Sequence, residues 1–246
     1  MAWTAVAEFP GGWQRHCVAQ GAPPPPTRVL GGTERHAGKE QALRLIGMLD
    51  SPYVRRVGIS LAMMEIPFTH EPLSVFADYA AFGEINPVVK APTFVTDDGT
   101  VLMDSTLILD HLERLVPPLR RLTPEDPKAH ARCQRLVGLA LAACEKTVQI
   151  VYEHKLRPAE KRHQPWIDRI EAQLAAAYAQ LEAETAADAP WLIGERPGQA
   201  DISVAVAWTF TRSMTAELLS PEQHPRLAAL AARAEALPAF IACPRS

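Results

Sequence analysis

The chain has 246 residues, a formal net charge of −3 and 48% hydrophobic residues, enough apolar material for one large domain or two of ordinary size. This charge balance offers no basic face or Lys/Arg run, so nucleic acid is not expected as a partner. No apolar run approaches the roughly 20 residues of a membrane span, and the N-terminus lacks the order of a secretory signal, so we expect no membrane association and a cytoplasmic location.

Residues 1–41 are interpreted as a flexible N-terminal arm. They contain four consecutive prolines at 23–26 and several glycines, but no sustained apolar period of helix or strand. A start codon assigned too far upstream would give the same composition, so two explanations stay open.

A β-α-β unit is predicted next. The short apolar run ALRLIGM (42–48) is typical of a buried strand, and PFTHEPL (67–73) indicates a second one. Between them, Pro52 suits the first turn of a helix. The apolar positions after it fall on one helix face: Val54, Val57, Leu61 and Met64. Such a unit predicts a right-handed crossover and a parallel strand pair.

After an irregular stretch, a hairpin and another helix are predicted. Strands at 93–96 and 100–103 are joined by Asp97-Asp98-Gly99, and the Asp-Gly step favours a tight turn. The helix behind them carries its apolar residues on one side: Ile108, Leu109, Leu112 and Leu115.

The second half of the chain is predicted to be helical. Alanine-rich segments with helical periodicity cover residues 128–156, 164–184, 198–213 and 223–237. The fold class is therefore α/β plus all-α. We expect the α/β domain over residues 42–117, a proline-rich linker over 118–126 and the all-helical domain over 127–246.

The cysteines and histidines give no metal site. The four cysteines at 17, 133, 144 and 243 lack C-x-x-C spacing, and the eight histidines are dispersed. We therefore expect no metal and a reducing compartment.

The turn Ser51-Pro52-Tyr53-Val54 resembles a C-P-Y-C thiol–disulfide turn in which both cysteines are replaced. A thioredoxin-like unit that opens on this turn and is followed by a helical bundle resembles a cytosolic glutathione S-transferase of the bacterial type with serine at the turn. The resemblance covers residues 42 to about 240. It implies a thioredoxin-like N-terminal domain, a helical-bundle C-terminal domain, a homodimer, and glutathione as the co-substrate that is transferred to a small electrophile or peroxide in detoxification.

Three segments carry the glutathione-site residues that the resemblance implies. In INPVVKAPTF (85–94), Pro92 matches the family's cis proline, and Ala91 before it is expected to pair with the cysteinyl main chain. Val89 stands where glycine is common and would stiffen the loop. In MDSTLILDHLE (103–113), Ser105 is expected to cap the helix and hold the γ-glutamyl carboxylate, and Asp104 to engage the γ-glutamyl ammonium.

Ser51 is the expected catalytic residue. A hydroxyl donor at a helix N-terminus can stabilise a thiolate, and Arg55 one turn further is expected to add positive potential. Tyr53 or a backbone N–H are the open alternatives for thiol activation. Without a cysteine at 51, thioltransferase activity is not expected there. Cys133 and Cys144 are not at helix N-termini that would lower a thiol pKa.

The segment WLIGERPGQADISVAVAW (191–208) resembles the family's capping motif in a weakened form. Gly198 stands at the cap, so only the carboxylate of Asp201 remains of the two reciprocal hydrogen bonds.

Other functions stay open at this point. A non-catalytic interaction or regulatory module with the same fold would fit the departures at Val89 and Gly198. A glutathione-dependent isomerase or dehalogenase would share the same glutathione site. Nothing in the sequence names the electrophile. Aromatic residues at helical spacing are more often core than site, and we assign none of the following to the electrophile site: Tyr79, Phe82, Tyr152, Trp166 and Trp208.

Overall fold

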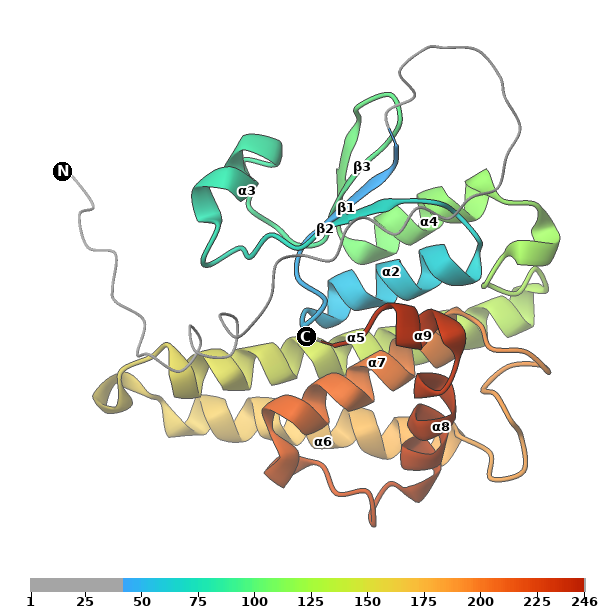
Figure 1. Ribbon diagram of the computed structural model, residues 1–246. Coiled ribbons are helices and arrows are strands. Elements are labelled where there is room, and N and C mark those ends of the chain that lie inside the picture. Colours follow the sequence, from blue (N-terminus) through green and yellow to red (C-terminus); the bar gives the residue numbers. More distant parts are fainter. Residues whose placement is uncertain (1–41, 246) are drawn as a thin grey trace, which may run out of the picture.

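The computed structural model of the chain describes residues 42–245. The predicted arm lies outside these residues. An α/β domain and an all-helical domain lie side by side (Figure 1). The first comprises β1 (Arg44–Ile46), α2 (Pro52–Met63), β2 (Thr69–Glu71), α3 (Tyr79–Ile85), β3 (Thr93–Val95), β4 (Val101–Met103) and α4 (Ser105–Leu115). After a 3-10 turn, η1 (Pro118–Arg120), the second comprises α5 (Pro127–Lys155), η2 (Ala159–Lys161), α6 (Gln164–Glu184), α7 (Gln199–Met214), η3 (Ala216–Leu218), α8 (Pro225–Glu235) and α9 (Pro238–Ala242).

The four strands form one mixed sheet in the order β2-β1-β3-β4. β1 and β2 are parallel, and β3 is antiparallel to both β1 and β4. The predicted parallel pair, the hairpin and the thioredoxin-like fold class are therefore confirmed. In the hairpin, Gly99 has a φ of +87°, a conformation that glycine adopts without steric cost.

Helices α2 and α4 lie against one face of the sheet, where Leu45, Phe94, Val57 and Ile108 share a buried cluster. Helix α3 lies within the stretch expected to be irregular, and its Phe82 belongs to a second, smaller buried cluster. This helix was missed because its seven residues bury only Phe82, so no apolar period marks it.

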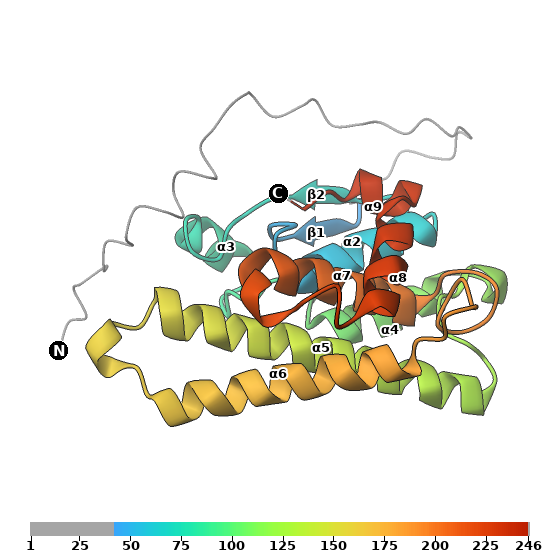
Figure 2. The same ribbon diagram turned by 90° about the horizontal axis from the view of Figure 1, so that it is seen from below.

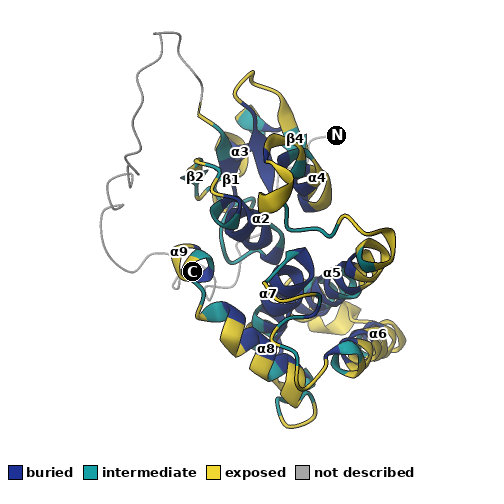
Figure 3. Ribbon diagram, turned by 90° about the vertical axis from the view of Figure 1, so that its right-hand side faces the viewer, coloured by how far each residue is buried: buried dark blue, intermediate teal, exposed yellow. Residues whose placement is uncertain are grey.

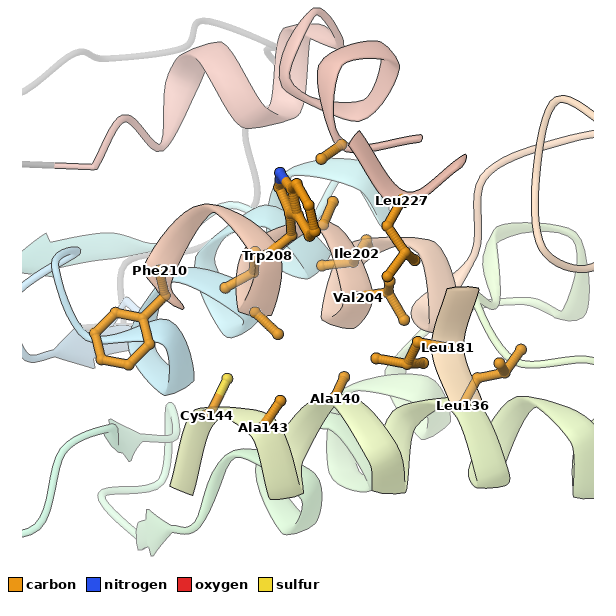
Figure 4. Packing of buried hydrophobic residues seen from close by; sticks show 14 of the residues in the cluster. Leu136, Ala140, Ala143, Cys144, Leu181, Ile202, Val204, Trp208, Phe210 and Leu227 are labelled. Carbon is orange, nitrogen blue, oxygen red and sulfur yellow. The ribbon is translucent and has the colours of Figure 1, made fainter. Parts of the chain in front are cut away.

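The all-helical domain is built around α7. Figure 2 shows α5 and α6 as a long antiparallel pair, and Figure 4 shows α7 packed on α5. The small side chains of Ala140 and Ala143 let α5 approach α7 closely, and Trp208 and Leu227 extend the same core. Buried Tyr178 donates a hydrogen bond of 2.9 Å to the carbonyl of Ala207, which satisfies its hydroxyl.

The start of α7 explains why glycine replaces the usual hydroxyl cap. Asp201 accepts hydrogen bonds from the N–H of Gly198 at 2.9 Å and of Leu192 at 2.8 Å, so the predicted carboxylate half of the cap is confirmed. The carbonyl of Leu122 in the linker accepts from the N–H of Gln199 at 2.8 Å. A Cβ at Gly198 would lie 2.7 Å from that carbonyl oxygen, so the linker occupies the space a side chain would need.

Helix α2 joins the two domains and is buried along almost its whole length (Figure 3). It packs on α4 in its own domain and on α7 and α9 in the other. Ser60 of α2 donates a hydrogen bond of 3.1 Å to the side-chain oxygen of Gln199. Between residues 42 and 245, no helix is long and apolar enough to cross a membrane.

Candidate functional site

A cleft of about 820 Å³ lies between the two domains. The α/β domain contributes one wall, from the β1–α2 turn, the loop after β2, the loop before β3 and the start of α4. The helical domain contributes the other wall, from one face of α5 and the end of α7.

The four predicted site residues all line the α/β wall of this cleft: Ser51, Ala91, Asp104 and Ser105. They come from three separate turns, which the sheet topology brings together. β1 and β3 are neighbours in the sheet, and α2 and α4 pack side by side on it, so the turns that precede β3, α2 and α4 meet at one edge.

Ser51 is the N-cap of α2, and its Oγ accepts a hydrogen bond of 3.4 Å from the N–H of Val54. Pro52 occupies the first helical position, as predicted. The bond is long and Ser51 is half-buried in the cleft wall, so its hydroxyl proton is available to an acceptor there. The N-terminal end of α2 adds partial positive charge at the same place.

The Ala91–Pro92 peptide bond is cis, as predicted. Val89 has a φ of +49°, the left-handed region that glycine favours. The loop therefore adopts a glycine-type conformation with a β-branched residue in it, at a cost of about 1–2 kcal/mol. Contacts of Val89 with the small cluster around Phe82 offset part of this cost.

The structure corrects the expected role of Ser105 as helix cap. Asp104 is the N-cap of α4, with a φ of +71°, and its carboxylate accepts from the N–H of Thr106 at 2.9 Å. Ser105 is the first helical residue and is only 4% exposed. A short carboxylate at the cap satisfies the helix, which leaves the Ser105 hydroxyl for other partners.

Arg56 is the partner of that hydroxyl. Its Nη1 donates to Ser105 Oγ at 3.0 Å and to Thr106 Oγ1 at 3.3 Å. The side chain is 2% exposed, and its Nε has no hydrogen-bond partner among the described residues. Burial lowers the pKa of Arg56 to about 10, so it still carries its charge near pH 7. Sequence reasoning missed this residue because it lies off the apolar face of α2.

Arg55, by contrast, does not serve the cleft as expected. Its guanidinium pairs with the carboxylate of Glu235 on α8 at 2.6 Å, and its Nε donates to the carbonyl of Cys243 at 2.9 Å. The charge is neutralised at the interface of α2 with the helical domain, and Arg55 does not line the cleft. The prediction that Arg55 adds positive potential at Ser51 was therefore wrong.

The two cysteines of α5 are not nucleophiles of the cleft. Cys133 and Cys144 are buried outside the cleft lining, and burial raises the pKa of Cys133 to about 11 and that of Cys144 to about 12. Both thiols are therefore protonated near pH 7, in keeping with the expectation that no thiolate forms on α5. Within residues 42–245, no group of three or more His, Cys, Asp or Glu could hold a metal ion.

Tyr53 lines the cleft and packs against the helical domain. Burial raises its pKa far above the usual value, with smaller contributions from the Cys144 and Glu145 side chains. The phenol therefore stays neutral and can donate, but not remove, a proton.

The helical wall of the cleft is mostly apolar. It consists of Gly138, Leu141, Ala142, Glu145, Val148, Gln149, Val151, Tyr152, Phe210 and Met214. Phe76, from the loop after β2, meets Tyr152 edge to face with ring centroids 6.3 Å apart, so an aromatic pair links the two walls. Phe82 and Trp208 are core residues, as the general preference of aromatics indicated, whereas Tyr152 lines the cleft.

The architecture is that of a two-domain glutathione transferase fold: a thioredoxin-like domain is followed by a helical domain, and the cleft between them lies at a turn without cysteine. Family models of the glutathione S-transferase N-terminal and C-terminal domains match residues 45–120 and 164–233. The chain belongs to the glutathione S-transferase family.

Individual relatives support the same assignment. A glutathione transferase family member from Pseudomonas fluorescens Pf-5, solved with bound glutathione, is 32% identical and has a TM-score of 0.73, with 83% of this chain and 100% of that chain covered. Maleylacetoacetate isomerase of Pseudomonas aeruginosa is 27% identical over 193 residues, which are 75% of this chain and 87% of the relative. A probable maleylacetoacetate isomerase of Caenorhabditis elegans is 37% identical over 86 residues, only 33% of this chain and 39% of the relative.

Proposed function

We propose that the protein binds glutathione in the interdomain cleft and presents its thiolate to a small electrophile or a peroxide. The observation that carries the proposal is the convergence of Ser51, Ala91, Asp104 and Ser105 on one cleft wall, opposite an apolar wall. The bound glutathione structure of the Pseudomonas fluorescens relative supports it.

The α/β wall has groups that complement the charged groups at both ends of glutathione. The N-terminus of α4 and the Ser105 hydroxyl suit the γ-glutamyl carboxylate, and the exposed carboxylate of Asp104 suits the γ-glutamyl ammonium. The main chain of Ala91 is assigned to the cysteinyl residue. Lys90, also in the cleft lining, offers a positive charge for the remaining carboxylate.

Glutathione would supply the thiol, and this chain would keep it ionised. The Ser51 hydroxyl donates a hydrogen bond to the sulfur, and the N-terminal end of α2 stabilises the negative charge. Lowering a thiol pKa by about 2 units requires only about 3 kcal/mol of differential stabilisation. Neutral Tyr53, which also lines the cleft, is the alternative hydrogen-bond donor to the sulfur.

The electrophile we propose is uncharged. Among the described lining residues, Glu145 is the single charged side chain that the helical domain contributes. Lys146 lies 3.3 Å from its carboxylate and offsets part of the charge, and the remainder repels carboxylates. The apolar side chains around Glu145 favour a neutral molecule of modest size.

A glutathione-dependent isomerase is the second candidate, because two curated relatives bear the name maleylacetoacetate isomerase. Such a substrate is a dicarboxylate, which Glu145 would disfavour. The non-catalytic module is less strongly supported than by the sequence alone. Its support was the departure of Val89 and Gly198 from the family pattern, and the structure accommodates both residues locally.

We also propose a homodimer, in which the thioredoxin-like domain of one subunit meets the helical domain of the other, and a cytoplasmic location. Val101 on β4 and Leu107 on α4 expose large apolar side chains that a second subunit would cover.

The test is a calorimetric titration of glutathione into the wild-type protein and into Asp104→Ala/Ser105→Ala, followed over pH by the ultraviolet absorbance of the bound thiolate. We expect micromolar to low-millimolar binding that the double variant loses, and a bound-thiol pKa below that of free glutathione. Absence of binding by the wild-type protein would refute the proposal and favour the non-catalytic module.

A further inference from the structure

Two adjacent buried arginines of α2 have partners of different kinds. Arg55 and Arg56 are 3% and 2% exposed. The charge of Arg55 is neutralised by Glu235 at 2.6 Å. Within residues 42–245, no carboxylate forms an ion pair with Arg56 within 4 Å, and its Nη1 donates hydrogen bonds to two hydroxyls at the start of α4.

An unpaired buried cation is costly. Removing a charge from water costs several kcal/mol even after the protein relaxes, and two neutral hydroxyls repay only part of that. Packing α4 on α2 does not require it, because an apolar side chain of similar volume would join the surrounding cluster at lower cost. The carboxylate of Asp104 acts on Arg56 from nearby, but among the described residues it forms no ion pair with Arg56 within 4 Å. The cost therefore points to a further negative partner that the folded chain does not itself contain.

The two hydroxyls lie between that cation and the cleft. Ser105 and Thr106 both line the cleft, and both accept from Arg56. In the described part of the chain, neither hydroxyl donates to a protein acceptor. A hydroxyl that accepts from a guanidinium has its own proton free, and the charge behind it makes it a stronger donor.

We infer that Arg56 is a positioning residue for the γ-glutamyl carboxylate: its buried charge holds the Ser105 and Thr106 hydroxyls with their protons toward the cleft and strengthens the anion site at the N-terminus of α4. The inference rests on the proposed function and adds a residue that never touches the ligand. The α-carboxylate of the γ-glutamyl residue is then the negative group that the guanidinium of Arg56 serves.

This role makes a ligand-selective prediction. The probe is 4-aminobutyryl-cysteinylglycine, which is glutathione without the α-carboxylate of its γ-glutamyl residue. Arg56→Met is expected to weaken glutathione binding about tenfold, since hydrogen bonds with charged groups contribute about this much. The affinity for the probe should change by less than about twofold, because it lacks the group that the charge serves.

A second readout separates this role from a structural one. Ligand-free Arg56→Met should unfold at the same or a higher temperature than the wild type, because a buried unpaired charge is removed. Were Arg56 only a tie between α2 and α4, the variant would unfold at a lower temperature and lose both ligands equally.

Further variants complete the design. Arg56→Lys keeps the charge and should bind glutathione within about threefold of the wild type. Arg114→Met, at the exposed far end of α4, also removes one positive charge and should leave both affinities unchanged. If Arg56→Met does not fold, Arg56→Gln, which keeps a donor but no charge, must show the same ligand-selective loss.

The outcomes are distinct. Equal effects of Arg56→Met on glutathione and the probe, or no effect on either, would overturn the role of Arg56 while leaving the glutathione site standing. Failure of the wild-type protein to bind glutathione at all would overturn the proposed function, and this inference with it.

Discussion

Arg55 donates two hydrogen bonds, of 2.7 and 2.6 Å, to the two carboxylate oxygens of Glu235, 180 residues away in the chain. The pair joins the first turns of α2 to the end of α8. Thr209 on α7 donates a further hydrogen bond of 2.8 Å to the same carboxylate. This ion pair, buried at Arg55 and partly exposed at Glu235, is therefore one of the contacts that hold together the two domains that form the walls of the cleft.

Removing the carboxylate should destabilise the whole molecule. Glu235→Gln leaves Arg55 buried with its charge uncompensated, and we expect a loss of about 3 kcal/mol in the free energy of unfolding. Urea unfolding measures it. Asp110→Asn, the same chemical change in the exposed Arg114–Asp110 pair, should cost less than about 0.5 kcal/mol. Equal costs for the two variants would show that the interdomain pair has no special role.

The same pair predicts a pH dependence. Burial raises the pKa of Glu235, but the hydrogen bonds from Arg55 and Thr209 outweigh it, and the net pKa lies below the ordinary value of 4.5. A depressed carboxylate pKa contributes stability that is present above the unfolded-state value and lost as the pH falls through the folded-state value. The wild type should therefore lose stability below about pH 4.5 more steeply than Glu235→Gln.

Ser51→Ala tests the thiol-activating hydroxyl. We expect turnover to fall by about 10²-fold or more, with glutathione affinity nearly unchanged, because the hydroxyl acts on the thiolate rather than on the peptide. Ser51→Thr, which keeps the hydroxyl, should retain more activity. The bound-thiol pKa should rise in Ser51→Ala. Unchanged turnover would remove Ser51 from the mechanism and direct attention to Tyr53→Phe.

Glu145 should set a preference among electrophiles by charge. Iodoacetamide and iodoacetate alkylate thiolates by the same displacement and differ in charge, so each kcat/KM is compared after division by its uncatalysed rate. Glu145→Gln should raise the value for iodoacetate about 3- to 10-fold, since one repulsive charge is removed, and leave iodoacetamide within about twofold. Glu160→Gln, exposed and outside the cleft lining, is the matched control. A wild-type preference for iodoacetate would contradict the uncharged class of electrophile.

Gly198→Ser should destabilise the protein although serine is the better helix cap. The added Cβ would meet the carbonyl oxygen of Leu122 at 2.7 Å, and we expect a cost of about 1–3 kcal/mol from the forced backbone shift. Gly138→Ala, in the exposed middle of α5 with no atom near the added methyl, should instead stabilise by about 0.5–1 kcal/mol. Thermal unfolding distinguishes the two. A stabilised Gly198→Ser would mean that the linker yields easily.

Much of the fold follows from local patterns in the sequence. The strand at 42–48, the helix that begins at Pro52 and the Asp-Gly hairpin are each specified by residues a few positions apart, as are the long alanine-rich helices. Helix α3 was not predictable in this way, because a seven-residue helix that buries one side chain leaves no period to detect.

The residues of the α/β cleft wall could also be predicted from local sequence patterns. Ser51, Ala91, Asp104 and Ser105 each lie at the start of a helix or strand, where backbone groups face outward, and the strand order brings these starts to one edge. Which residue caps α4 was not accessible, since Asp104 and Ser105 are both good caps and the φ of +71° at Asp104 depends on how the chain leaves β4.

Only the tertiary structure decided what the two arginines of α2 do. They are neighbours in the sequence with the same chemistry, and both are buried. Arg55 meets a carboxylate 180 residues further on, whereas Arg56 meets a hydroxyl 49 residues further on. Local spacing determines hydrogen bonds within a turn of helix, but the partner of a buried charge is set by which distant elements pack against it, and that is decided by the fold as a whole.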